Sequence, residues 1–195
     1  MLLIVPIGAL LIMAEIRISN IRKELVNYSA RNAASAAATA GIENSLDTDK
    51  VRYADLIKFG RDKNGNIVSV TTDAYYLNKI GNNIGDEIDK HINQMKSYVI
   101  KIPFSVLFSE QLINGRGPKI PMIFVMTGIT TTDFENKFTA AGVNQTHHRI
   151  MMNITVNTYV IHSGNVTVVP YKTNVCIAES IVVGITPQTF AEIIR

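Results

Sequence analysis

The sequence predicts an α+β fold, in which an N-terminal transmembrane or long helix precedes a mixed, mostly antiparallel sheet with a β-hairpin and an amphipathic helix packed on it. Three observations carry this prediction. Residues 15–46 contain no proline and a single glycine, Gly41, which favours one long helix. Asn64-Gly65 stands between two strand-like runs and is typical of a hairpin turn. Residues 145–162 alternate between two kinds of side chain, with the period of a half-buried strand.

The composition allows one folded domain and a helical extension. The chain has 195 residues, of which 47% are hydrophobic, and its mean hydropathy of +0.15 is high for a soluble domain. The net charge of +3 comes without a clustered basic face or interleaved aromatic residues, so nucleic-acid binding is not expected. Cys176 is the only cysteine, which excludes an internal disulfide and a cysteine-based zinc site.

Residues 1–14 carry no charge, and as an α-helix they would rise only about 21 Å against a hydrocarbon core of about 30 Å. They lack the basic segment and cleavage site of a secretory signal. Two interpretations stay open: the C-terminal part of a membrane span that starts upstream, or an ordinary core helix. We favour the span, because a run without a polar face suits lipid. The cations at positions 17, 22, 23 and 31 would keep the domain cytosolic, unless an upstream basic segment reverses the orientation.

The predicted organisation has three segments: residues 1–18, the end of the membrane span; residues 19–48, an alanine-rich helix; and residues 49–195, a single α+β domain. In the second segment the apolar stripe that starts at Ile18 and Ile21 fades into small residues. Small residues let another element approach closely. We expect this helix to lie against the chain's own sheet, and the alternative is a self-association face.

A hairpin and a second helix are expected next. Residues 53–59 and 67–71 are predicted as the hairpin strands, with Asn64 and Gly65 supplying positive φ angles at the turn. Thr72-Asp73 offers an N-cap for the helix that follows. The apolar stripe of this helix consists of Leu77, Ile80, Ile84, Ile88 and Ile92.

Further strands are predicted at residues 98–103, 119–130, 145–162 and 165–177. Residues 105–112 look like one helical turn before a loop. Residues 132–142 are left open between a capped helix and an extended stretch in which Phe134 and Phe138 are buried.

Two polar blocks, residues 115–121 and 142–149, are the least ordinary residues of the chain. In the first block, Gly115 and Gly117 can shape a backbone nest for an anion, with Arg116 and Lys119 beside it. The spacing is not that of a Walker A loop, and Pro118 removes an amide that would face phosphate. We favour a structural turn here, and binding of an anionic lipid headgroup or a glycan polymer is the alternative.

The second block is expected to hold the first through a structural polar network. The expected members of the network are Gly115, Gly117, Asn144, Gln145, Thr146, His148 and Arg149. Asn144 and Thr146 should bond neighbouring backbone, because a buried polar group left unpaired costs about 1–3 kcal/mol. Arg149 should reach Asp133, Glu135 or carbonyls of the first block. On this account Arg149→Ala lowers stability by about 1–3 kcal/mol.

No catalytic residue, metal or cofactor is expected. His147 and His148 are adjacent in a strand and point to opposite faces, so they cannot bind one metal ion together. The chain also lacks nucleophile-elbow, zinc-protease and paired-carboxylate motifs, so we do not expect an enzyme. A weaker alternative is an envelope hydrolase that uses His148 with Asp133 or Glu135.

Four stretches, KNGNIVSV, IPFSVLFSEQLINGRGPKIP, TDFENKFTAAGVNQTHHRI and IAESIVVG, together resemble the YunB family of sporulation proteins from endospore-forming bacteria. GRGPKIP and AGVNQTHHRI carry most of the resemblance. It implies a single-pass membrane protein of the mother cell that acts in spore formation, with its domain in the intermembrane space. The implied partners are other sporulation or envelope proteins, with homo-oligomer formation left open. The resemblance brings no catalytic residues.

Overall fold

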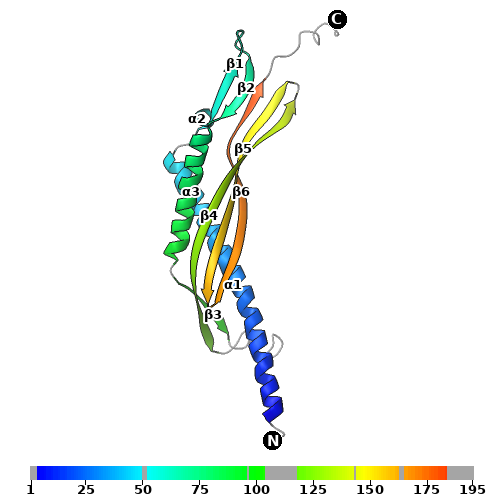
Figure 1. Ribbon diagram of the computed structural model, residues 1–195, viewed down its shortest axis with the longest axis vertical. Coiled ribbons are helices and arrows are strands. Elements are labelled where there is room, and N and C mark those ends of the chain that lie inside the picture. The colour runs from blue at the N-terminus through cyan, green and yellow to red at the C-terminus, as the bar shows by residue number, and fades with distance from the viewer. Residues whose placement is uncertain are drawn as a thin grey trace. The chain divides into compact units, whose positions relative to one another are not determined.

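The computed structural model describes residues 4–49, 52–95, 97–103, 118–142, 144–162 and 165–183, so the helical turn predicted at 105–112 lies outside the described residues. In chain order the elements are α1 (Ile4–Asp49), α2 (Tyr53–Leu56), β1 (Ile57–Arg61), β2 (Ile67–Thr72), α3 (Ala74–Gln94), β3 (Tyr98–Pro103), β4 (Lys119–Gly142), β5 (Gln145–His162) and β6 (Asn165–Val183). A long helix therefore comes first and long strands come last (Figure 1), which confirms the predicted α+β class.

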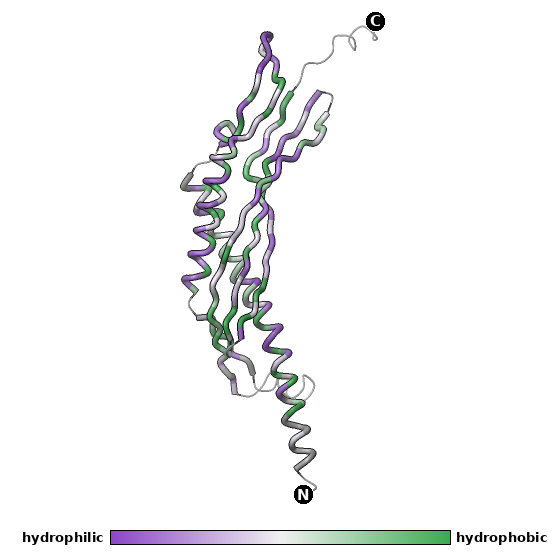
Figure 2. The backbone as a smooth tube through the Cα atoms, in the orientation of Figure 1, coloured by the Kyte–Doolittle hydropathy of each residue, from purple (hydrophilic) through white to green (hydrophobic). Residues whose placement is uncertain are grey.

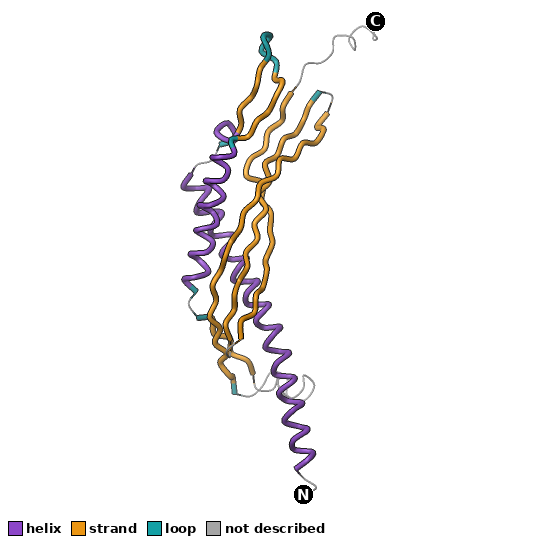
Figure 3. The backbone as a smooth tube through the Cα atoms, in the orientation of Figure 1, coloured by secondary structure: helices purple, strands orange, loops and turns teal. Residues whose placement is uncertain are grey.

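The strands form two sheets, one of order β1-β2 and one of order β3-β4-β5-β6. β1 and β2 pair antiparallel with Ile57 opposite Thr72, and β3 and β4 pair antiparallel with Tyr98 opposite Phe124. β4, β5 and β6 are neighbours both along the chain and across the sheet (Figure 3). Their connections are too short for a parallel crossover, so the mostly antiparallel sheet is confirmed.

α1 is one uninterrupted helix of 46 residues. Near its start the large apolar side chains of Ile12, Met13 and Ile16 are 61%, 72% and 57% exposed. In the part of the chain that the structure describes, no helix has an apolar stretch long enough to cross a membrane.

The predicted hairpin is confirmed, but its start and its turn differ from the prediction. Tyr53–Leu56 form a helical turn, α2, and β1 follows it. Gly65 has a positive φ of 85°, whereas Asn64 does not have a positive φ. The Asp62 side chain instead accepts hydrogen bonds of 2.8 Å from the backbone N–H groups of Asn64 and Asn66. Such an Asx turn reverses the chain without a second left-handed residue.

α3 begins at the predicted cap and buries the predicted stripe. The Asp73 carboxylate accepts a hydrogen bond of 3.2 Å from the Tyr76 backbone N–H, and its second oxygen accepts one of 3.2 Å from Lys58. In Figure 2, green positions recur between purple ones along α3, as an amphipathic helix requires. The members of the stripe, Leu77, Ile80, Ile84, Ile88 and Ile92, are each at most 5% exposed.

The stretch left open between helix and strand is a strand, because β4 continues to Gly142. Phe134 is half-buried, but Phe138 is 54% exposed, so the burial expected for both rings is wrong for Phe138. The chain then turns into β5 at Gly142 and Asn144, whose φ angles are 152° and 57°. Glycine and asparagine are the residues that best tolerate positive φ. Turn geometry therefore explains part of the second polar block.

The chain forms two compact units. Unit 1 comprises Met1–Ala37, Asp89–Ile129 and Asn157–Tyr171, and unit 2 comprises Ala38–Ile88, Thr130–Val156 and Lys172–Arg195. The long elements α1, α3, β4, β5 and β6 contribute residues to both units. The three-part division of the chain at residues 18 and 48 stays a prediction.

In unit 1 the helices lie close to one face of the sheet. Ala30 and Ala34 of α1 are fully buried, and the Tyr171 hydroxyl of β6 donates a hydrogen bond of 3.2 Å to Ser35 Oγ. A Cβ added at Gly128 of β4 would come within 2.6 Å of the Ile92 side chain of α3. The small residues of α1 therefore pack within the chain, as we expected for a helix lying against its own sheet.

In unit 2 the two long helices touch directly. A Cβ added at Gly41 of α1 would lie 2.6 Å from Ile88 Cγ1 of α3. β5 contributes the fully buried Ile150 and Ile154 to this core, and α2 contributes Leu56. His148, on the same stretch of β5, is a buried polar side chain next to these apolar residues.

Candidate functional site

His148 lies on β5 and is fully buried. Its Nδ1 is 2.8 Å from the Tyr53 hydroxyl, and its Nε2 is 3.0 Å from the amide oxygen of Asn136. Because an amide oxygen can only accept, Nε2 carries the proton, and Nδ1 accepts the hydrogen bond that the Tyr53 hydroxyl donates. Both nitrogens of a neutral imidazole are thus satisfied.

The network continues from Asn136 to the hairpin. The Asn136 amide nitrogen donates to Thr72 Oγ1 at 3.4 Å. The bonded residues come from α2, β5, β4 and β2, so side chains distant in sequence connect the hairpin with the long sheet. We call this set the His148 cluster; its members are Tyr53, Thr72, Asn136, Phe138 and His148.

Aromatic rings cover the imidazole on two sides. The Phe138 ring stacks on His148 with centroids 4.4 Å apart and an interplanar angle of 9°. The Tyr53 ring meets the imidazole edge-on at 5.8 Å and 73°. Such contacts add to the area that the rings bury. They also separate the imidazole from water.

Burial sets the protonation state of the cluster. Removal from water disfavours charge, so it lowers the pKa of His148 below its ordinary value and raises the pKa of Tyr53. Both side chains are therefore neutral near pH 7. A neutral, covered imidazole with both nitrogens bonded is suited to holding elements together.

The neighbours of His148 on β5 lie on the other face of the strand. His147 is half-buried and its Nε2 is 3.1 Å from a Glu179 carboxylate oxygen on β6. The opposite orientation expected of His147 and His148 is confirmed.

Arg149 does not make the expected ion pair. The buried Nε of Arg149 has no hydrogen-bond partner within the described part of the chain. A Glu135 carboxylate oxygen lies 3.5 Å from Lys137 Nζ instead. Asp133 and Glu135 are exposed at odd positions of β4, on the same face of the sheet as Arg149. Neither carboxylate forms an ion pair with Arg149, so the predicted pairing with Asp133 or Glu135 is wrong.

We now expect Arg149→Met to change the free energy of unfolding by less than about 1 kcal/mol. The substitution keeps the packing of the stem and removes a buried N–H group that has no acceptor. Urea unfolding of the wild type and the variant measures the difference in the free energy of unfolding, provided that both have the same m value. A loss above about 2 kcal/mol would mean that Arg149 makes a bonded contact in solution.

The other residues of the polar blocks fall in different places. Gly115, Arg116 and Gly117 lie outside the described residues, so the anion nest stays a prediction. Lys119 is exposed at the start of β4, opposite Pro103 of β3. At the other block, Asn144 forms the turn described above, and Gln145 and Thr146 are exposed.

The sequence pointed to His148 but missed its partners Tyr53, Thr72 and Asn136. The sequence predicts a strand at Tyr53, which lies in α2, and does not decide between helix and strand at Asn136, which lies in β4. The signal that could have found Asn136 is parity: on a strand it shares a face with Phe134 and Phe138.

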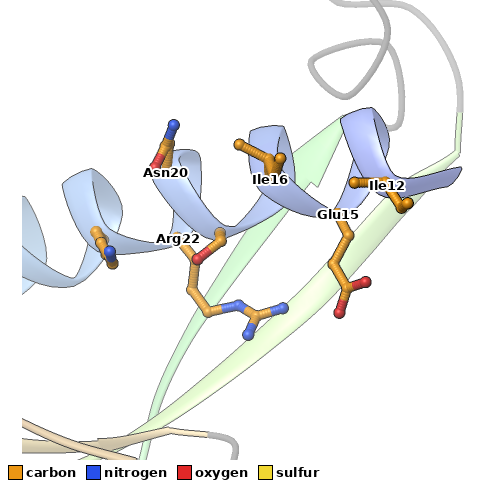
Figure 4. Close-up of a pocket in the computed structure, with 7 residues that line it drawn as sticks. Ile12, Glu15, Ile16, Asn20 and Arg22 are labelled. Carbon is orange, nitrogen blue, oxygen red and sulfur yellow. The ribbon is translucent and has the colours of Figure 1, made fainter. Parts of the chain in front are cut away.

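An open hollow of about 470 Å³ lies along α1 in unit 1 (Figure 4). Glu15 and Arg22 extend from the helix there, and Arg22 Nε has no hydrogen-bond partner among the described residues. The lining residues are Ile12, Glu15, Ile16, Ser19, Asn20, Arg22 and Lys23. They carry both signs of charge, so we assign no ligand. The described residues also contain no group of three metal-ligating side chains.

Comparison with known proteins relates this chain to a family of sporulation proteins. Residues 99–189 match the model of a family described as Sporulation protein YunB. The resemblance of this part of the chain to the YunB family is thereby confirmed. Sporulation protein YunB of Bacillus subtilis (strain 168) is 23% identical to it over 166 residues, which cover 78% of this chain and 65% of that relative. No solved structure matches the chain.

The residues matched to the YunB family include only part of the His148 cluster. Asn136, Phe138 and His148 fall inside the matched residues, whereas Tyr53 and Thr72 precede them. The matched part thus supplies the imidazole and its acceptor on the sheet. The residues before it supply the two groups that the hairpin and α2 bring to the cluster.

Proposed function

We propose that this chain acts in endospore formation as a membrane-anchored assembly protein, which contacts other proteins of the envelope between mother cell and forespore. The observation that carries the proposal is the match of residues 99–189 to the YunB family of sporulation proteins. The relative in Bacillus subtilis is itself described as a sporulation protein, and this chain spans 65% of its length.

The character of the His148 cluster supports an assembly role over a catalytic one. Both imidazole nitrogens bond to protein groups, and the side chain is fully buried. A general base needs to reach the proton that it removes. A cluster of this kind is suited to holding folded elements together.

The start of α1 supports the anchor. Residues 1–14 are uncharged, and Ile12, Met13 and Ile16 are each more than half exposed. Exposed large apolar side chains on a helix favour lipid or protein contact over water. On this proposal the anchor holds the folded part on the extracytoplasmic side of a membrane, in the intermembrane space.

Deletion of residues 1–14 tests the anchor and the process together. The full-length chain should sediment with membranes of sporulating cells, and the deletion variant should move to the soluble fraction while keeping a cooperative thermal transition. A strain without the chain should form fewer heat-resistant spores, and only the full-length chain should restore the number.

Two results would count against this proposal. A deletion variant that aggregates without a cooperative transition would show that residues 1–14 belong to the core. Unchanged spore numbers in the strain without the chain would contradict the role in spore formation. Protease protection of a C-terminal tag, with and without permeabilised membranes, reads out the side on which the domain lies.

A further inference from the structure

The sheet of unit 1 has one covered face and one uncovered face. On β4, Phe124 and Met126 are 1% and 3% exposed and point toward the helices, whereas their neighbours Ile123 and Val125 are 63% and 45% exposed. Because side chains alternate along a strand, Ile123 and Val125 point away from the helices. Both side chains are apolar although they are exposed.

The neighbouring strands extend this uncovered face. Val99 of β3 is directly opposite Ile123, so it shares its face, and it is 50% exposed. On β6, Val168 is 50% exposed beside Val169, which is 2% exposed. We call this surface the outer sheet face; its exposed apolar members are Val99, Ile123, Val125, Ile129, Ile161, Val166 and Val168.

Charge on this face is confined to one end. Within unit 1, the described residues of β3 to β6 contain no carboxylate, and their only lysines are Lys101 and Lys119. Lys101 is opposite Pro121 and Lys119 is opposite Pro103, so both lie where β4 begins. The rest of the face carries no charge that burial would leave unpaired.

We propose that a second copy of this chain packs on the outer sheet face, so that two sheets form a sandwich. Two sheets commonly pack face to face about 10 Å apart through alternating apolar side chains. From the usual strand spacing and rise, the face covers about 500 Å² in projection, of the order of the roughly 800 Å² that each partner of a standard interface buries.

The charges favour a second copy over other occupants. A two-fold axis perpendicular to the strands runs the two sheets in opposite directions, which puts the lysines at opposite ends of the sandwich. No like charges then meet and no charge is buried at the centre. An acidic partner would find cations only at one end, and its own carboxylates would face seven apolar side chains.

This inference rests on the proposed function in one respect: assembly through a second copy is one form of the protein–protein contact proposed above. The two fail separately. A monomeric chain that is still required for spore formation overturns the sandwich alone. A dimeric chain that spore formation does not require overturns the proposed function alone.

Sedimentation equilibrium of the full chain in detergent micelles tests the sandwich. The mass of the wild type should rise from one chain to two between about 1 µM and about 100 µM, the range of an interface of modest size. Ile123→Lys and Val168→Lys, on different strands of the face, should each weaken dimer formation by at least about 10-fold, because a cation would enter an apolar interface.

Val68→Lys is the matched control. Val68 is 66% exposed on β2 in unit 2 and is not a member of the outer sheet face, so its substitution should leave dimer formation unchanged. Thermal melting checks that each variant is folded, and two face variants are used so that one remains if the other does not fold. A wild type that stays monomeric overturns the proposal. Association that both face variants leave unchanged also overturns it, because the contact would then lie elsewhere, for example at the start of α1.

Discussion

His148→Ala should lower the free energy of unfolding by about 2–4 kcal/mol, because it removes a buried side chain that two partners require. The Tyr53 hydroxyl loses an acceptor at 2.8 Å, and the Asn136 amide oxygen loses a donor at 3.0 Å. Phe138 also loses the ring on which it stacks at 4.4 Å. For a chain of this length we expect the melting temperature to fall by about 5–15 °C.

His147→Ala is the matched control, one residue earlier on the same strand. Its side chain is 29% exposed and its partner Glu179 is 62% exposed, so water screens and replaces the contact. This change should cost no more than about 0.5 kcal/mol. Equal losses in the two variants, measured by urea unfolding, would mean that the His148 cluster contributes no more than a surface pair.

The same residue predicts how stability depends on pH. Burial lowers the pKa of His148 in the folded chain, whereas the unfolded chain keeps an ordinary value of about 6.5. The stability that comes from the neutral imidazole is complete above about pH 6.5 and is lost as the pH falls toward the folded pKa, because the unfolded chain binds the proton first. Between about pH 7.5 and pH 5.5 the wild type should lose more stability than His148→Ala.

The fold was predictable where short-range patterns decide it. The stripe from Leu77 to Ile92 has a helical period, and Asn64-Gly65 marks the hairpin, so each could be placed without knowing its neighbours. Residues 132–142 could not, because their local propensities suit either state. Tertiary pairing determines their state. The pairing of β4 with β3 reaches only to Phe124, but β4 also pairs with β5, and this second pairing makes residues 132–142 a strand.

The candidate site was predictable only in part, for the same reason. The apolar alternation around His148 showed that its side chain would be buried, and a buried imidazole needs partners. Its partners come from positions 53 and 136, whose approach depends on how the hairpin docks. The predicted ion pair of Arg149 failed for another reason. Glu135 lies on the same face of the sheet but contacts Lys137 of its own strand, and which cation a carboxylate meets depends on side-chain conformations that the sequence does not show.

Gly41→Val should lower the free energy of unfolding by about 3 kcal/mol, because no space exists for its side chain. A Cβ at this position of α1 would lie 3.0 Å from the backbone nitrogen of Ile88 and 3.2 Å from its Cα, as well as 2.6 Å from its side chain. A side chain can change rotamer, but the α3 backbone can move away only if the close packing between the two helices opens. Gly85→Ala is the matched control on α3: its Cβ would meet nothing closer than Thr130 Cγ2 at 3.9 Å. That change should raise stability by about 0.5–1 kcal/mol, the usual gain from replacing a glycine inside a helix. Thermal unfolding should therefore shift in opposite directions for the two glycines, and a Gly41→Val variant that melts with the wild type would show that α1 and α3 do not touch at this position.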